Sequence, residues 1–301
     1  MSLIFFERVD FVLKKILFTG VGTAIATPFN SNGINIPAFE KLLSFQLLNS
    51  VDSIVVCGTT GEASTMSDDE KSSVIKCAVD FVDRKVPIIV GCGSNDTNKA
   101  IFNAKMAESL GADGLLVVTP YYNKCTQSGL IKHYSKIADS VSIPIILYNV
   151  PSRTGVNIEP ETCFELSKVS NIVAIKEASG NISQVAKISA LCNDNLFIYS
   201  GNDDQVIPIL SLGGIGVISV LSNIKPLETH NMVTSFFDGN LSASKNLQLG
   251  LLPLISALFC EVNPIPVKYA LNILGFDFGV PRLPLSELSS KNKLLLDNLL
   301  A

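Results

Sequence analysis

NIVAIKEASG, residues 171–180, holds a continuous apolar run from Ile172 to Ile175, followed by a lysine, a glutamate and a turn-forming Ser-Gly pair. Strands that are apolar throughout, rather than at alternate positions, are buried on both faces, as parallel strands covered by helices are. The stretch therefore predicts a buried parallel strand with charged residues at its end.

Runs of this kind occur eight times along the chain, with longer amphipathic segments between them. They are GTAIATPF (22–29), SIVVCG (53–58), PIIVGCG (87–93), GLLVVTP (114–120), PIILYNVP (144–151), IVAIKEAS (172–179), LFIYSGND (196–203) and GVISVLS (216–222). Eight strand–helix units of about 25 to 30 residues match a (β/α)8 TIM barrel, which typically takes about 250 residues. A doubly wound open sheet with parallel strands is the competing arrangement.

Helix signals lie between the predicted strands. Ser67 with Glu70 three residues later forms a capping-box pattern, and Asp96-Thr97 begins the segment that ends at Leu110-Gly111. After residue 241 no strand pattern occurs, and the sequence predicts three helices separated at Asn263-Pro264 and at GVPRLPL. We expect an N-terminal extension over residues 1–18, a barrel with the active site over 19–240, and a C-terminal helical region over 241–301.

Composition excludes several classes of function. The net charge of -4 leaves no strongly basic surface for nucleic acid, and no run approaches the roughly 18 apolar residues of a membrane span. Seven widely spaced cysteines without a C-x-x-C pair, and an N-terminus without a cleavage-site pattern, predict free thiols in the cytoplasm. The two histidines, His133 and His230, lie in polar helix-like contexts, so we expect surface positions for both and no histidine-based metal site.

The carboxyl ends of barrel strands converge on one mouth, where active-site groups project. Polar residues follow several of the predicted strands, and Lys176 is the one lysine of 19 that lies within an apolar strand-like run. A solvated lysine has a pKa of about 10.4, and burial can lower it to about 5–6. A desolvated lysine can therefore attack a carbonyl and form an imine. The alternative is a structural ion pair with Glu177, which is a poor partner because adjacent strand residues point to opposite faces.

The other candidates at this mouth are less specific. Tyr122 and Tyr148 could serve in acid–base chemistry or simply pack as amphipathic side chains. The turn CGTTGE (57–62) has two glycines that let the backbone approach a ligand, but it could equally be a plain strand–helix loop. Arg153, one of four arginines, presents a fork of donors that suits a carboxylate. Asp203-Asp204 could ligate a metal, but we interpret it as a helix N-cap.

Six ordered motifs, CGTTGE, VTPYYNK, YNVPSRTG, AIKEASGN, YSGNDD and GGIGVISV, resemble those of the dihydrodipicolinate synthase family of pyruvate-dependent class I aldolases. The resemblance covers about residues 17 to 300. It implies a TIM barrel that condenses pyruvate with L-aspartate 4-semialdehyde in lysine and diaminopimelate biosynthesis, with no metal and no cofactor beyond a covalent imine. It also implies a homotetramer of two tight dimers.

The resemblance implies a role for each site residue. Lys176 would form the imine with pyruvate and Tyr148 would shuttle protons. Thr60 would link Tyr148 to Tyr122, which would act in trans from the neighbouring subunit. The pyruvate carboxylate would be held by Thr59 and Thr60, and the semialdehyde carboxylate by Arg153. The backbone at Gly201 and Ile218 would line the site.

Two alternatives remain at this point. A sister aldolase that cleaves N-acetylneuraminate or a 2-keto-3-deoxy sugar acid would share the lysine and the tyrosine but would not need Arg153. A non-catalytic small-molecule-binding barrel would leave Lys176 inert. One departure concerns regulation: where lysine-inhibited relatives carry histidines and a carboxylate, this chain has Ala63, Ser64, Asp68, Lys71 and Lys99, which predicts weak or absent feedback inhibition by lysine.

Overall fold

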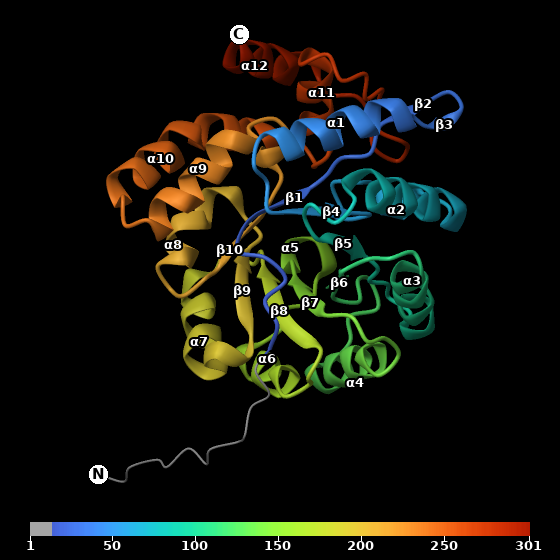
Figure 1. Ribbon diagram of the computed structural model, residues 1–301, viewed down its shortest axis with the longest axis vertical. Helices are drawn as coiled ribbons and strands as arrows, with labels where there is room; N and C mark the ends of the chain where they lie inside the picture. Colours follow the sequence, from blue (N-terminus) through green and yellow to red (C-terminus); the bar gives the residue numbers. More distant parts are fainter. Residues whose placement is uncertain (1–13) are drawn as a thin grey trace.

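The structure is a computed structural model that describes residues 14–301 (Figure 1). Eight parallel strands close into a barrel in the order β1-β10-β9-β8-β7-β6-β5-β4. Their bounds are β1 (Gly20–Ala24), β4 (Ser53–Val56), β5 (Ile88–Gly91), β6 (Gly114–Val118), β7 (Ile145–Asn149), β8 (Ile172–Glu177), β9 (Phe197–Ser200) and β10 (Gly216–Ser219). The predicted (β/α)8 barrel is confirmed, and the doubly wound open sheet is wrong because β1 pairs with both β4 and β10.

Helices surround the barrel and separate its strands in the sequence. They are α1 (Ile36–Leu48), α2 (Asp68–Val82), α3 (Thr97–Ser109), α4 (Gln127–Ala138), α5 (Pro151–Thr154), α6 (Pro160–Ser167), α7 (Ile182–Cys192), α8 (Val206–Leu210) and α9 (Pro226–Phe237). The start signals at Ser67 and Asp96 are confirmed. Ser67 and Glu70 form the reciprocal capping box of α2, and the Asp96 carboxylate accepts bonds from Asn98 N and Lys99 N at the start of α3.

The core has two layers, as expected for strands that are buried on both faces. An inner cluster fills the barrel and includes Val55, Ile89, Leu116 and Ile146. An outer cluster, far larger, lies between the strands and the surrounding helices. The continuous apolar runs in the sequence therefore serve both layers at once.

Two local details differ from the sequence prediction. The first strand begins at Gly20 rather than at residue 22, because Gly20 pairs with Gly216 on β10, where a Cβ atom on Gly216 would collide with the Gly20 carbonyl. A short antiparallel hairpin, β2 (Phe29–Asn30) and β3 (Gly33–Ile34), follows β1 and was not predicted. Two-residue strands carry too little pattern to be recognised in a sequence.

Three further helices follow the barrel: α10 (Leu241–Leu258), α11 (Ile265–Ile273) and α12 (Ser290–Leu300). Figure 1 shows α11 and α12 on the side of the barrel that also carries α1 and the hairpin. Asn35, which directly precedes α1, donates from its side-chain Nδ2 to the carbonyl of Asp277, in the segment after α11, at 3.2 Å. Residues 1–13 of the predicted N-terminal extension lie outside the described residues.

Candidate active site

Lys176 and Tyr148 lie side by side on neighbouring strands. The parallel register pairs Tyr148 of β7 with Lys176 of β8, and the lysine Nζ lies 4.5 Å from the centre of the tyrosine ring. Both side chains are buried, with exposed fractions of 5% for Lys176 and 8% for Tyr148. The lysine nitrogen thus lies over an aromatic face at the carboxyl end of the barrel.

The surroundings of Lys176 offer it little compensation for burial. Within residues 14–301 it forms no salt bridge, the seven ion pairs there involving other residues. Gly201 lies against its stem, since a Cβ atom at Gly201 would come within 3.1 Å of Lys176 Cε and 2.6 Å of Ala178 Cβ. The space beside the end of the lysine side chain is thus kept open by a residue without a side chain.

Glu177 points to the opposite side of β8, as strand alternation predicts. Its carboxylate accepts from Asn149 Nδ2 at 2.9 Å, from Gln184 Nε2 at 3.0 Å and from the Ser179 backbone N–H. Gln184 belongs to α7, so Glu177 joins two strands to a covering helix. Sequence reasoning assigned this residue no role; the structure gives it a structural one.

The turn at residues 57–62 follows β4 and opens on two adjoining cavities. The smaller, of about 180 Å³, contains Lys176, and the larger, of about 430 Å³, extends away from it. The residues that line both cavities are Gly58, Thr59, Leu116, Tyr148, Val150 and Arg153. A small carbonyl substrate at Lys176 would therefore have a neighbouring space for a second molecule.

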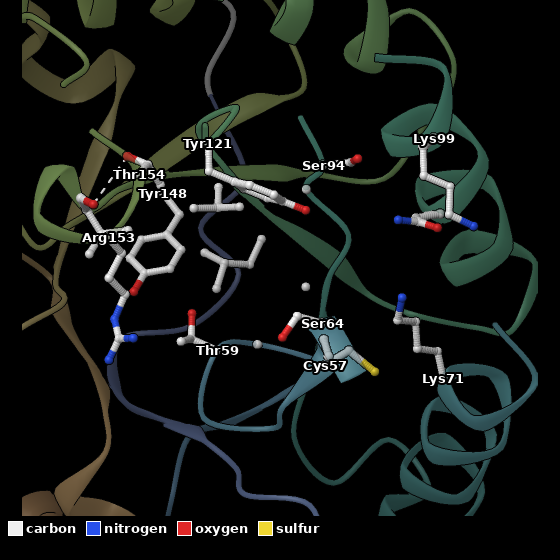
Figure 2. Close-up of a pocket in the computed structure, with 18 residues that line it drawn as sticks. Cys57, Thr59, Ser64, Lys71, Ser94, Lys99, Tyr121, Tyr148, Arg153 and Thr154 are labelled. Atoms are coloured by element: carbon white, nitrogen blue, oxygen red, sulfur yellow. Dashed lines mark hydrogen bonds between the residues drawn. The ribbon is translucent and has the colours of Figure 1, made fainter. Parts of the chain in front are cut away.

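The two threonines of this turn differ in their surroundings. Thr59 is exposed and lines both cavities, and Figure 2 shows its side chain near the hydroxyl end of Tyr148. Thr60 is 3% exposed, lines only the smaller cavity, and its Oγ1 accepts a hydrogen bond from Asn263 Nδ2 at 3.0 Å. Thr59 is thus the exposed threonine of the turn, open to both cavities, and Thr60 is the buried one.

Arg153 stands at the mouth of both cavities. It lies on the short helix α5, directly after β7, and Figure 2 shows its guanidinium beside the hydroxyl end of Tyr148. Arg153 Nη2 donates to the Asn263 carbonyl at 3.4 Å, and the side chain remains exposed. An exposed, tethered guanidinium can still bind a carboxylate.

The larger cavity ends at two lysines. Figure 2 shows Lys71 and Lys99 on the side opposite Arg153, with Ser64 and Ser94 between. Lys99 Nζ pairs with Asp68 Oδ2 at 2.7 Å. Of the five positions that carry the expectation of weak feedback inhibition, Ala63, Ser64, Lys71 and Lys99 line this cavity, and Asp68 is paired with Lys99.

Two residues that the resemblance assigned to the site lie away from its cavities. Tyr122 is 89% exposed and lines neither cavity. Ile218 is fully buried in the inner barrel cluster and likewise lines neither. Gly201, by contrast, lines the smaller cavity beside Lys176.

Sequence reasoning missed a buried ion pair behind the turn. Lys268 Nζ lies 2.7 Å from Glu62 Oε1, and the two side chains are 0% and 1% exposed. The other carboxylate oxygen of Glu62 accepts from the Arg282 backbone N–H at 2.8 Å. Burial lowers the pKa of Lys268, and the Glu62 carboxylate opposes that shift. The C-terminal helical region thus holds the end of the 57–62 turn.

Asp203 and His133 correct two sequence interpretations. The Asp203 carboxylate caps no helix of its own; it accepts from Val220 N and Leu221 N, across the mouth at the end of β10, and burial raises its pKa. His133 is 6% exposed rather than on the surface, and its Nδ1 lies 2.9 Å from Thr97 Oγ1. Asp203 and His133 are therefore both buried, although their neighbours in the sequence are polar.

Comparison with known proteins identifies the family. The model of the dihydrodipicolinate synthetase family matches residues 17–301. The chain belongs to this family. The 4-hydroxy-tetrahydrodipicolinate synthase of Caldicellulosiruptor saccharolyticus is 58% identical over 281 residues, which are 93% of this chain and 95% of that protein.

Solved structures of dihydrodipicolinate synthases agree in fold. The enzyme of Thermotoga maritima superposes with a TM-score of 0.93 at 45% identity, over 95% of this chain and 98% of that one. A monomeric dihydrodipicolinate synthase variant superposes with the same TM-score and identity, over 94% and 96%. Within residues 14–301, no helix is long and apolar enough to cross a membrane. The same residues contain no group of three or more His, Cys, Asp or Glu side chains that could hold a metal ion.

Proposed function

We propose that the chain condenses pyruvate with L-aspartate 4-semialdehyde through an imine on Lys176. The product is 4-hydroxy-tetrahydrodipicolinate, on the route to diaminopimelate and lysine. The observation that carries this proposal is a buried strand lysine that forms no salt bridge within residues 14–301 and lies 4.5 Å from the centre of the Tyr148 ring. The curated relatives bear the name of this synthase, and Arg153 at the mouth suits a substrate with its own carboxylate.

Imine formation uses Lys176 as the nucleophile. Its neutral Nζ attacks the ketone carbon of pyruvate, and the resulting carbinolamine loses its hydroxyl as water to leave a protonated imine. Tyr148 is the proton shuttle, because its ring adjoins Nζ and its hydroxyl end lies in the cavity beside Thr59. Thr59 and Thr60 hold the pyruvate carboxylate, and the backbone at Gly201, which lines the smaller cavity, adjoins the imine.

Carbon–carbon bond formation follows in the adjoining space. The protonated imine withdraws electrons, and loss of a methyl proton gives an enamine whose terminal carbon adds to the aldehyde of the semialdehyde. Arg153 binds the carboxylate of that second substrate. The amino group of the second substrate then displaces Lys176 by transimination, which closes the ring and frees the enzyme. The covalent imine is the only cofactor-like species that this route requires.

A second copy of the chain completes the proton relay in this proposal. Tyr122 acts on the site of a neighbouring subunit, where Thr60 links it to Tyr148; its 89% exposure and its absence from both cavities of its own chain support this role. We propose a homotetramer of two such dimers, although a relative is described as monomeric. The proposal places the protein in the cytoplasm, where its seven free thiols stay reduced.

Borohydride trapping tests the proposed function. We expect that reduction in the presence of pyruvate leaves a covalent adduct, which peptide mass spectrometry locates on Lys176, because borohydride converts the imine to a stable secondary amine. The exposed Lys187 on α7 serves as the internal control and should stay unmodified. No adduct on Lys176, or an adduct spread over surface lysines, contradicts the proposal. N-acetylneuraminate offered in place of both substrates should not be turned over.

Feedback inhibition by lysine is expected to be weak. An effector ammonium entering the larger cavity would meet the Lys71 and Lys99 ammonium groups, which repel it, while Asp68 is already paired with Lys99. We expect millimolar lysine to leave the initial rate nearly unchanged at saturating pyruvate. Strong inhibition at micromolar lysine would refute this prediction. The matched comparison is the inhibition of a Lys99→Glu variant, in which a negative charge replaces the positive charge at position 99.

A further inference from the structure

Asn263 joins the C-terminal region to the active-site mouth. It lies between α10 and α11, is 4% exposed, and lines the smaller cavity together with Lys176. It is separated from the barrel residues that it contacts by more than 100 positions in the sequence. No motif singled it out, because an asparagine before a proline reads simply as a helix boundary.

The contacts of Asn263 reach two substrate-binding residues. Its side-chain Nδ2 donates to Thr60 Oγ1 at 3.0 Å, and its backbone carbonyl accepts from Arg153 Nη2 at 3.4 Å. Thr60 belongs to the turn after β4, and Arg153 to the helix after β7. One residue outside the barrel thus spans two of the loops that build the mouth.

The remaining polar atom of Asn263 indicates that packing alone does not explain this residue. Its Oδ1 is buried without a hydrogen-bond partner among residues 14–301. An unpaired buried acceptor is destabilising, and an apolar residue of similar volume, such as leucine, would avoid that cost. The asparagine is explained by its donor contact with Thr60 rather than by stability.

We propose that Asn263 is a positioning residue for the condensation, acting through Thr60. Its amide fixes the rotamer of the buried Thr60 hydroxyl and the path of the turn that also carries Thr59. The main-chain contact places Arg153 relative to the same turn. This inference rests on the proposed function, in which these two threonines hold the carboxylate of pyruvate.

Steady-state kinetics of Asn263→Leu test the proposal. We expect the KM for pyruvate to rise about three- to tenfold, the effect of losing one neutral hydrogen bond, while kcat changes less. Thr60→Val removes the same bond at nearly constant volume together with the hydroxyl that contacts pyruvate, and should raise the KM at least as much. The double variant Asn263→Leu/Thr60→Val should match Thr60→Val alone, because Asn263 acts through the hydroxyl that Thr60→Val removes.

The outcomes separate this inference from its alternatives. An unchanged pyruvate KM in Asn263→Leu, or factors that multiply in the double variant, overturns the positioning role. A purely structural role would lower the melting temperature and the active fraction while leaving the KM unchanged. If Asn263→Leu does not fold, Thr60→Val and the smaller change Asn263→Ser provide the same comparison. Failure of borohydride trapping in the unaltered chain would instead contradict the function itself.

Discussion

Lys176→Met is expected to lower kcat/KM for the condensation by roughly 10⁴- to 10⁶-fold, the loss seen when nucleophiles or their partners are removed from other covalent catalysts. Methionine has about the length of the lysine stem up to Cε and carries no amine, so it can form no imine with pyruvate. The fold should survive, because Lys176 is 5% exposed and forms no salt bridge within residues 14–301. The coupled assay and thermal unfolding of the same preparation measure both quantities.

Lys187→Met is the matched control for this experiment. Lys187 is exposed on the following helix, α7, and touches neither cavity, so both activity and melting temperature should match those of the unaltered chain. Borohydride and pyruvate should label this control but not Lys176→Met. If Lys176→Met kept more than a trace of activity, the imine mechanism would have to be abandoned.

Lys268→Met is expected to destabilise the protein by about 3–5 kcal/mol, the cost of removing one partner from a buried ion pair. Glu62 is 1% exposed and would lose the ammonium group paired with it, and the left-handed conformation of Glu62 (φ 56°) is held from the same side. Urea unfolding at fixed protein concentration measures the free energy of unfolding. Lys291→Met, an exposed lysine on α12, should leave it unchanged.

The double variant Glu62→Gln/Lys268→Met separates charge from packing. Neutralising both partners should recover most of the lost stability, because the penalty in the single variant comes from an uncompensated carboxylate. Equal destabilisation in the single and double variants would show that the shape of Lys268 matters rather than its charge. Lys268 Nζ also lies 4.4 Å from the centre of the Phe29 ring. The single and the double variant both lose this contact, so part of the destabilisation should remain in both.

The sequence predicts the barrel because its signal is local and repeated. Each continuous apolar run marks a strand that is buried on two faces, and the structure places a strand within every one of the eight runs, the first shifted by two residues. Lys176 could be recognised for the same reason, since a charge inside such a run violates the pattern. Strand alternation alone also predicted that Glu177 faces away from it.

The partners of the site could not be predicted, because their signals are not local. Asn263 and Lys268 lie 203 and 206 residues from the turn residues that they contact, in segments that read as a loop and an amphipathic helix. His133 was expected on the surface because its neighbours in the sequence are polar, yet its side chain points toward Thr97 of the adjacent helix. Tertiary contacts of this kind leave no periodicity in the chain.

The late position of Lys268 has a consequence for biosynthesis. A ribosome makes the chain from the N-terminus, so all eight barrel strands, which end at Ser219, emerge before the residue that neutralises Glu62. Until then the turn after β4 carries an uncompensated carboxylate, and the mouth lacks Asn263. The strands of the nascent barrel are therefore all synthesised before the two residues, Asn263 and Lys268, that complete its mouth.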